Sequence, residues 1–156
     1  MIEISERLFV GSDADCRVGD VDWAVVHACK SPCHQRAVGY RGSLPSSDPN
    51  YLVLSKSNDL YLNIIDPPRP LFKLLTFTSF LEFAMRHWEQ GKKVLIHCNL
   101  GESRAPTLAL LFLAKCRREI SAESFDTAKR EFQRIFPYYQ PGQGIQTYLR
   151  ATWKEL

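Results

Sequence analysis

The sequence predicts an α/β fold with a central, mostly parallel sheet flanked by helices. Along the 156-residue chain, short apolar runs rich in β-branched residues alternate with longer segments of helical periodicity. The run 94–97 follows Gly91 and two lysines and has the apolar character of an interior parallel strand. It leads through a short loop into an almost wholly apolar segment, residues 105–114, which is typical of a buried helix. The chain is long enough for one sizeable core and too short for two ordinary domains.

The strands are predicted from short aliphatic or aromatic runs bounded by turn residues. They are residues 8–11, 23–28, 51–54, 60–65 and 94–97, with the last strand in the centre of the sheet.

Three helices are predicted besides the one at 105–114, in which Pro106 occupies the first turn. The first covers residues 71–90 and ends at Gly91. Ser121 is predicted to cap a second helix that runs through residue 135, and residues 145–156 form the last, amphipathic helix. Apolar residues of the first helix recur at helical spacing and are expected in the core: Phe77, Leu81, Ala84 and Trp88.

The loop between the strand at 94–97 and the helix after it has unusual chemistry. It opens with Cys98 and closes with Arg104, with five residues between them. Backbone N–H groups at the start of a helix favour negative charge, and Gly101 allows the loop to curl tightly around an anion. In this setting we expect Cys98 to be a reactive thiolate and Arg104 to bind two oxygens of an oxyanion. His97 lies on the strand and points away from Cys98, so we expect it to organise the site from behind.

The motif His97-Cys98-x-x-Gly101-x-Ser103-Arg104 resembles the signature loop of the cysteine-dependent protein phosphatases, in particular the small dual-specificity phosphatases. Residues 4–12 and 23–28 are similar to the family's opening strand and to its strand near the catalytic loop. The resemblance implies that residues 1–156 form a single catalytic domain, in which the phosphate-binding loop joins a central strand to a helix.

The resemblance also implies an activity. The chain is expected to be a phosphate monoester hydrolase that dephosphorylates phosphotyrosine and phosphoserine or phosphothreonine in proteins. Cys98 would be the nucleophile that forms a cysteinyl-phosphate, and Arg104 would clamp the phosphoryl group. The rest of the phosphate-binding loop would be Asn99, Leu100, Gly101, Glu102 and Ser103. The loop interior lacks lysine, so phosphoinositide substrates are not expected.

Members of this family need a general acid, for which Asp66 is the candidate. It follows the strand-like run 61–65, precedes a proline-rich turn, and lies 32 residues before Cys98. Protonation of the leaving oxygen typically accelerates such a reaction by about a hundredfold to ten-thousandfold. Asp59, in a polar stretch predicted to be a turn, is the fallback acid.

Ala105 departs from the family pattern, which commonly has Ser or Thr after the arginine. A hydroxyl there would stabilise the departing thiolate, so slow breakdown of the phosphoenzyme is expected unless Ser103 substitutes for it. This departure keeps open the alternative of a phosphate- or phosphopeptide-binding module, a pseudophosphatase. A rhodanese-like sulfur carrier is a second alternative, which would not need Asp66.

The five cysteines indicate reduced thiols, with no disulfide framework. Cys29, Cys33 and His34 have too few partners to predict zinc, so no metal and no cofactor is expected. Cys29 follows the strand beside Cys98 and could trap an oxidised Cys98 as a disulfide. The net charge of +3 is no signature of nucleic-acid binding, and no signal peptide or membrane span is recognised. We expect a cytoplasmic monomer whose partner is a phosphorylated protein.

Overall fold

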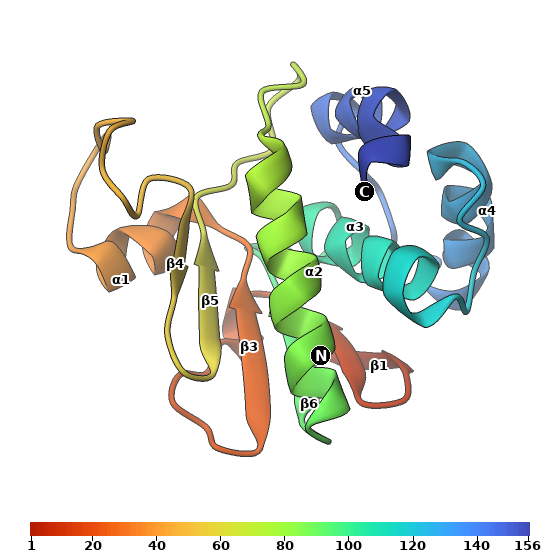
Figure 1. Cartoon of the computed structure of the whole chain (residues 1–156), viewed down its shortest axis with the longest axis horizontal. Helices are drawn as coiled ribbons and strands as arrows, with labels where there is room; N and C mark the ends of the chain where they lie inside the picture. The colour runs from red at the N-terminus through yellow and green to blue at the C-terminus, as the bar shows by residue number, and fades with distance from the viewer.

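The computed structural model describes residues 1–156 and contains one six-stranded sheet (Figure 1). The strand order across the sheet is β1-β2-β6-β3-β5-β4. The strands are β1 (Ile2–Ser5), β2 (Leu8–Gly11), β3 (Trp23–His27), β4 (Val53–Ser55), β5 (Asp59–Leu62) and β6 (Lys93–His97).

The middle of the sheet is parallel and its two edges are antiparallel. β6 pairs in parallel with β2 on one side and with β3 on the other, and β3 pairs in parallel with β5. The edge strands β1 and β4 pair antiparallel with β2 and β5. The predicted α/β fold with a mostly parallel sheet and an interior strand at 94–97 is therefore confirmed.

The larger helices cover one face of this sheet. In Figure 1 helix α2 crosses in front of the strands, α3 lies beside it, and α4 and α5 stack outside α3. The helices are α1 (Gln35–Val38), α2 (Leu74–Glu89), α3 (Arg104–Leu111), α4 (Phe125–Ile135) and α5 (Gln143–Thr152). A cluster of 32 buried residues between this face and the helices forms the core. None of the helices combines the length and apolar composition of a membrane span.

Several element boundaries differ from the sequence prediction by a few residues, as in β4, α2 and α5. Two further differences have a clear physical cause. The strand predicted at 60–65 ends at Leu62, because the chain beyond it leaves the ladder and the Ile64 carbonyl instead accepts hydrogen bonds from Lys30 N and Arg104 Nη1. The helix predicted from Ser121 begins at Phe125. Its cap is Ser124, whose hydroxyl accepts the Thr127 N–H at 3.1 Å.

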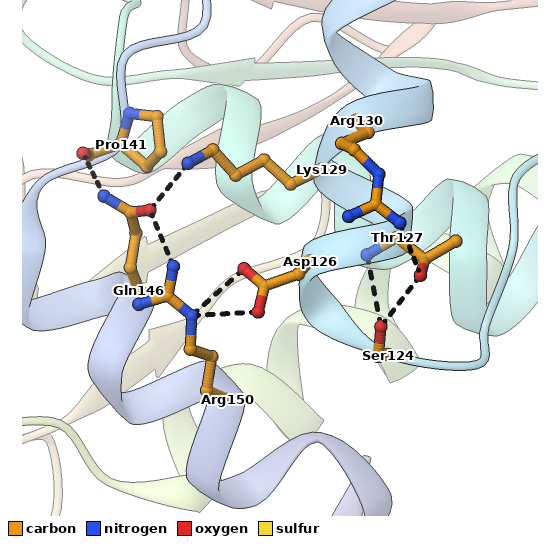
Figure 2. A network of polar contacts seen from close by, with 8 residues as sticks. All are labelled: Ser124, Asp126, Thr127, Lys129, Arg130, Pro141, Gln146 and Arg150. Atoms are coloured by element: carbon orange, nitrogen blue, oxygen red, sulfur yellow. Dashed lines mark hydrogen bonds and ion pairs between the residues drawn. The ribbon is translucent and has the colours of Figure 1, made fainter.

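Polar side chains tie α4 to α5 (Figure 2). Arg150 Nε donates to both carboxylate oxygens of Asp126, at 3.0 and 3.1 Å. Lys129 Nζ donates to Gln146 Oε1 at 2.8 Å, and Gln146 Nε2 donates to the Pro141 carbonyl at 3.0 Å. The network therefore fixes the turn at the start of α5, which reaches the 98–104 loop.

Candidate active site

The 98–104 loop leaves the sheet between two parallel neighbours. Cys98 N donates to the Gly11 carbonyl of β2 at 3.4 Å, and Ala28 N donates to the His97 carbonyl at 2.8 Å. Asp13 N donates to the Asn99 carbonyl at 3.2 Å. The loop is thus anchored on both sides at the carboxyl ends of the parallel strands, which is where ligands bind in open α/β sheets.

Cys98 lies at the base of the loop and is only 2% exposed. Its Sγ accepts the Gly101 N–H at 3.2 Å, which favours negative charge on the sulfur. Gly101 has a φ of +77°, and a Cβ there would lie 2.9 Å from the Gly11 carbonyl oxygen. Backbone geometry and close approach to β2 therefore both require glycine at this position.

Arg104 is held by two acceptors of the protein. Nη1 donates to the Ile64 carbonyl at 3.1 Å, and Nη2 donates to Asn99 Oδ1 at 2.7 Å. Asn99 Nδ2 donates in turn to the Ser31 carbonyl at 3.1 Å. The side chain of Asn99 therefore orients Arg104, while its backbone belongs to the loop.

The candidate acid Asp66 lines the same cavity as Cys98 and Arg104. This cavity has a volume of about 170 Å³. Its remaining lining residues are Leu100, Glu102, Ser103 and Gln140. Asp59 is not among them, because it is buried on β5 with its carboxylate directed at a histidine. The predicted turn at Asp59 is wrong, and the structure separates this fallback acid from the cavity.

The start of α5 packs against the segment that carries Asp66, a contact that sequence reasoning missed. A Cβ at Gly142 would overlap the Asp66 carboxylate, and a Cβ at Gly144 would overlap the carbonyls of Pro67 and Arg69. The sequence 141–144 predicts a turn, and its Gly-x-Gly pattern is the signal that this turn meets another backbone closely.

The hydroxyl of Ser103 does not reach the thiol. Ser103 Oγ accepts the Gly142 N–H at 2.9 Å, and the Ser103 carbonyl accepts the Thr107 hydroxyl at 2.7 Å. Gly101 provides the hydrogen bond that Cys98 Sγ receives. Ala105 is fully buried and supplies no hydroxyl, so the departure noted in the sequence is not offset by Ser103.

Behind the loop lies a buried chain of polar side chains. His97 Nε2 is 2.8 Å from His27 Nδ1, and His27 Nε2 is 2.9 Å from Asp59 Oδ1. Burial, together with the neighbouring His27, lowers the pKa of His97 to about 4, so His97 is neutral at physiological pH. His97 thus faces the opposite side of β6 from the cavity.

Cys29 is buried beyond the end of β3. Hydrogen bonding with the Cys33 thiol lowers the pKa of Cys29 to about 7, and the charge of Arg104 contributes. Neither cysteine lines the cavity of Cys98. A protective disulfide between Cys29 and Cys98 stays a prediction.

The chain has the fold of a class of known proteins, the cysteine-dependent phosphatases of the dual-specificity type. Human DUSP28 has the same fold, with a TM-score of 0.65 and 17% identity over 99% of this chain and 96% of that one. The human tyrosine phosphatase-like serine/threonine/tyrosine-interacting protein matches with a TM-score of 0.66 and 18% identity over 98% and 95% of the two chains.

Sequence comparison points to the same class. Human dual specificity protein phosphatase 5 is 37% identical over 63 residues, which are 40% of this chain and 16% of that protein. The putative tyrosine phosphatase 123R of Invertebrate iridescent virus 6 is 35% identical over 49 residues, 31% of this chain and 34% of that protein. No family model matches the chain. The resemblance to the small dual-specificity phosphatases that the sequence predicted is confirmed.

Proposed function

We propose that the chain is a single catalytic domain that hydrolyses phosphate monoesters on tyrosine and on serine or threonine of proteins. The observation that carries the proposal is one cavity lined by a hydrogen-bonded Cys98, the guanidinium of Arg104 and the carboxyl group of Asp66. These supply a nucleophile, a charge clamp and an acid, which is the set that the reaction needs. The proposed substrate is a phosphorylated protein, and we propose that the chain acts on it as a monomer in the cytoplasm.

The first step forms a cysteinyl-phosphate. The Cys98 thiolate attacks phosphorus, the ester P–O bond breaks, and the leaving oxygen takes the proton of Asp66. Arg104 keeps its contacts with Ile64 and Asn99 and binds two phosphoryl oxygens with its other N–H groups, whose planar arrangement matches those oxygens. Backbone N–H groups of the loop and the start of α3 stabilise the remaining charge.

The second step frees the enzyme. A water molecule gives a proton to the Asp66 carboxylate and attacks phosphorus, the S–P bond breaks, and inorganic phosphate and the Cys98 thiolate result. No hydroxyl faces the departing sulfur, since Ser103 is bonded to Gly142 and residue 105 is alanine. Breakdown of the intermediate should therefore limit turnover, and an initial burst of product should precede the steady state.

The test is hydrolysis of an aryl phosphate between pH 5 and 8 in the presence of EDTA. The wild type should turn over, and Cys98→Ser and Arg104→Lys should lose activity, because thiolate and bidentate clamp cannot be replaced by those groups. Asp66→Asn should lower the rate and remove the dependence on a protonated acid. A Cys98→Ser variant that retains activity would exclude the cysteinyl-phosphate.

The alternative is a phosphopeptide-binding module with negligible turnover, and Ala105 is the observation that favours it. One structural match is called "phosphatase-like" and "interacting" in its own name. In this case the wild type would bind vanadate or a phosphopeptide at the loop, and no product would form even with Asp66 intact.

A further inference from the structure

Four metal-ligating side chains meet on the face of the sheet opposite the large core. They are Cys16, His27, Cys33 and His97, and their ligand atoms all lie within 4.8 Å of one another. His27 and His97 are paired in register on β3 and β6. Their neighbours Val26 and Ile96 belong to the core under the helices. Because side chains alternate along a strand, the two histidines project from the other face.

We propose that these four residues bind one zinc ion. Two thiolates and two imidazoles form a Cys₂His₂ donor set, which zinc takes in tetrahedral geometry. Bonds of about 2.3 Å to sulfur and 2.0–2.1 Å to nitrogen place a tetrahedral S and N about 3.6 Å apart. Cys16 Sγ and His27 Nδ1 are 3.6 Å apart. His27 Nδ1 and His97 Nε2, at 2.8 Å, need to separate by roughly half an ångström to bind the ion together.

Asp59 supports this assignment from behind the ligands. Its Oδ1 is 2.9 Å from His27 Nε2, so it can accept a hydrogen bond from the Nε2–H and leave the Nδ1 lone pair free for the metal. A carboxylate on the second nitrogen of a ligating histidine is a common feature of zinc sites. His97 Nδ1 is buried without a hydrogen-bond partner, so the ring proton that His97 Nε2 shares with His27 Nδ1 can move to Nδ1 when Nε2 binds the ion.

The cluster can be reached from solvent. Cys16 is exposed, and a cavity of about 210 Å³ is lined by Cys16, His27 and Cys33. Arg36 lines the same cavity. Zinc with two thiolates and two neutral imidazoles has no net charge, and the guanidinium of Arg36 would balance the carboxylate of Asp59.

The proposed zinc site is not the group of residues that the sequence analysis considered for zinc and set aside. Of Cys29, Cys33 and His34, only Cys33 contributes a ligand. His34 is engaged elsewhere, with its ring nitrogens 2.7 Å from the Tyr40 hydroxyl and 2.9 Å from the Asn50 carbonyl oxygen. The other three ligands come from distant segments of the chain, so no short sequence motif predicts the site.

The test is a titration of the whole, reduced, EDTA-treated protein with Co²⁺, followed by Zn²⁺. Wild type should bind one equivalent of Co²⁺, with intense thiolate-to-cobalt absorption and the bands of tetrahedral coordination, and one equivalent of Zn²⁺ should abolish both. Cys16→Ser and Cys33→Ser should each lose about half of the thiolate band, because each removes one of the two sulfur ligands. Cys116→Ser, which changes a cysteine outside the cluster, is the matched control and should bind like wild type.

Two further variants sharpen the result. Cys98→Ser should keep the full spectrum, because the loop thiol is not a ligand. Asp59→Asn should weaken zinc binding by about 10- to 100-fold while the spectrum at saturation persists. No cobalt–thiolate band in wild type, or a band that survives both Cys16→Ser and Cys33→Ser or disappears in Cys98→Ser, would overturn the proposal. A Cys16–Cys33 disulfide formed in air, with no metal uptake by the reduced protein, would also overturn it. None of these outcomes depends on phosphatase activity.

Discussion

In the 98–104 loop, a backbone N–H contacts the cysteine and a side chain contacts the arginine. The Gly101 N–H bonds Cys98 Sγ, and Asn99 Oδ1 holds Arg104 Nη2. The arginine is therefore oriented by its neighbours, and this pre-organisation would reduce the entropy lost on binding the proposed phosphoryl group.

Ala105 offers a direct test of what limits turnover. Ala105→Ser adds the hydroxyl that the loop lacks, so it should shrink the burst and raise the steady-state rate of aryl phosphate hydrolysis. Stopped-flow detection of the first turnover measures both. Ala109→Ser is the matched control, since Ala109 is also fully buried on α3 but lies one turn further from the loop. An unchanged burst in Ala105→Ser, or the same gain in Ala109→Ser, would refute this prediction.

Gly142 tests the position of the proposed acid. In Gly142→Ala the new Cβ would overlap the Asp66 carboxylate and displace it. Hydrolysis of an alkyl phosphate, whose leaving group needs protonation, should fall by about tenfold or more, which is part of the hundredfold or larger contribution of general acid catalysis. Hydrolysis of an activated aryl ester should be less affected. Rates with both substrates measure this selectivity. Gln143→Ala, at the exposed next position, should change neither rate.

At the level of elements, hydrogen bonds from α4 and α5 support the 98–104 loop. Gln146 links Lys129 of α4 to the Pro141 carbonyl (Figure 2). The adjacent Gly142 N–H donates to the Ser103 hydroxyl in the loop. A contact path thus runs from the outer helices to the residue that precedes Arg104.

The N-cap of α4 is Ser124 in the structure, whereas the sequence predicts Ser121, and stability measurements can tell the two apart. Ser124→Ala removes the hydroxyl that accepts the Thr127 N–H and should lower the free energy of unfolding by about 1 kcal/mol. Ser121→Ala changes the residue that the sequence singled out, and should cost less. Urea denaturation of both variants measures the difference, and a larger loss in Ser121→Ala would reverse the assignment.

At the scale of the whole molecule, buried histidines make stability depend on pH. Burial lowers the pKa of His97 to about 4 and lowers those of His34 and His87 as well. These groups take up protons more readily in the unfolded chain, whose histidines titrate near 6.5. Stability should therefore fall as the pH drops below about 6.5 toward 4.

For His97 alone this linkage amounts to about 2 kcal/mol between pH 8 and pH 5. Urea denaturation in EDTA at several pH values measures it. His87 lies on α2 and outside the cavity of Cys98. His87→Leu should therefore weaken the dependence of the free energy of unfolding on pH and leave that cavity unchanged. A free energy of unfolding that stays constant from pH 8 to pH 5 would contradict the prediction.

The sequence predicted the parallel core because a parallel strand buried on both faces is a continuous apolar run, as at 94–97. It also predicted the loop at 98–104, since strand, loop and helix are contiguous. It missed β1, whose residues are exposed or half-buried on the sheet edge and lack a clear apolar pattern. It placed the α4 cap at Ser121, because both serine hydroxyls accept a nearby N–H, and only the backbone shows that the N–H bound by Ser124 belongs to the helix whereas that bound by Ser121 precedes it.

The sequence by itself determined the fold class, through its alternation of strand-like and helical segments. It also determined the chemistry of the 98–104 loop, because the residues of that loop are contiguous in sequence. Only the tertiary structure decided that Asp66 shares a cavity with Cys98 and packs on Gly142. It also decided that Asp59 is a buried partner of His27, and that four ligand-type side chains converge behind the loop. These contacts join segments far apart in sequence. The pairing register of β3, β5 and β6 brings His27, Asp59 and His97 together, and the packing of loops, not residue spacing, adds the other residues.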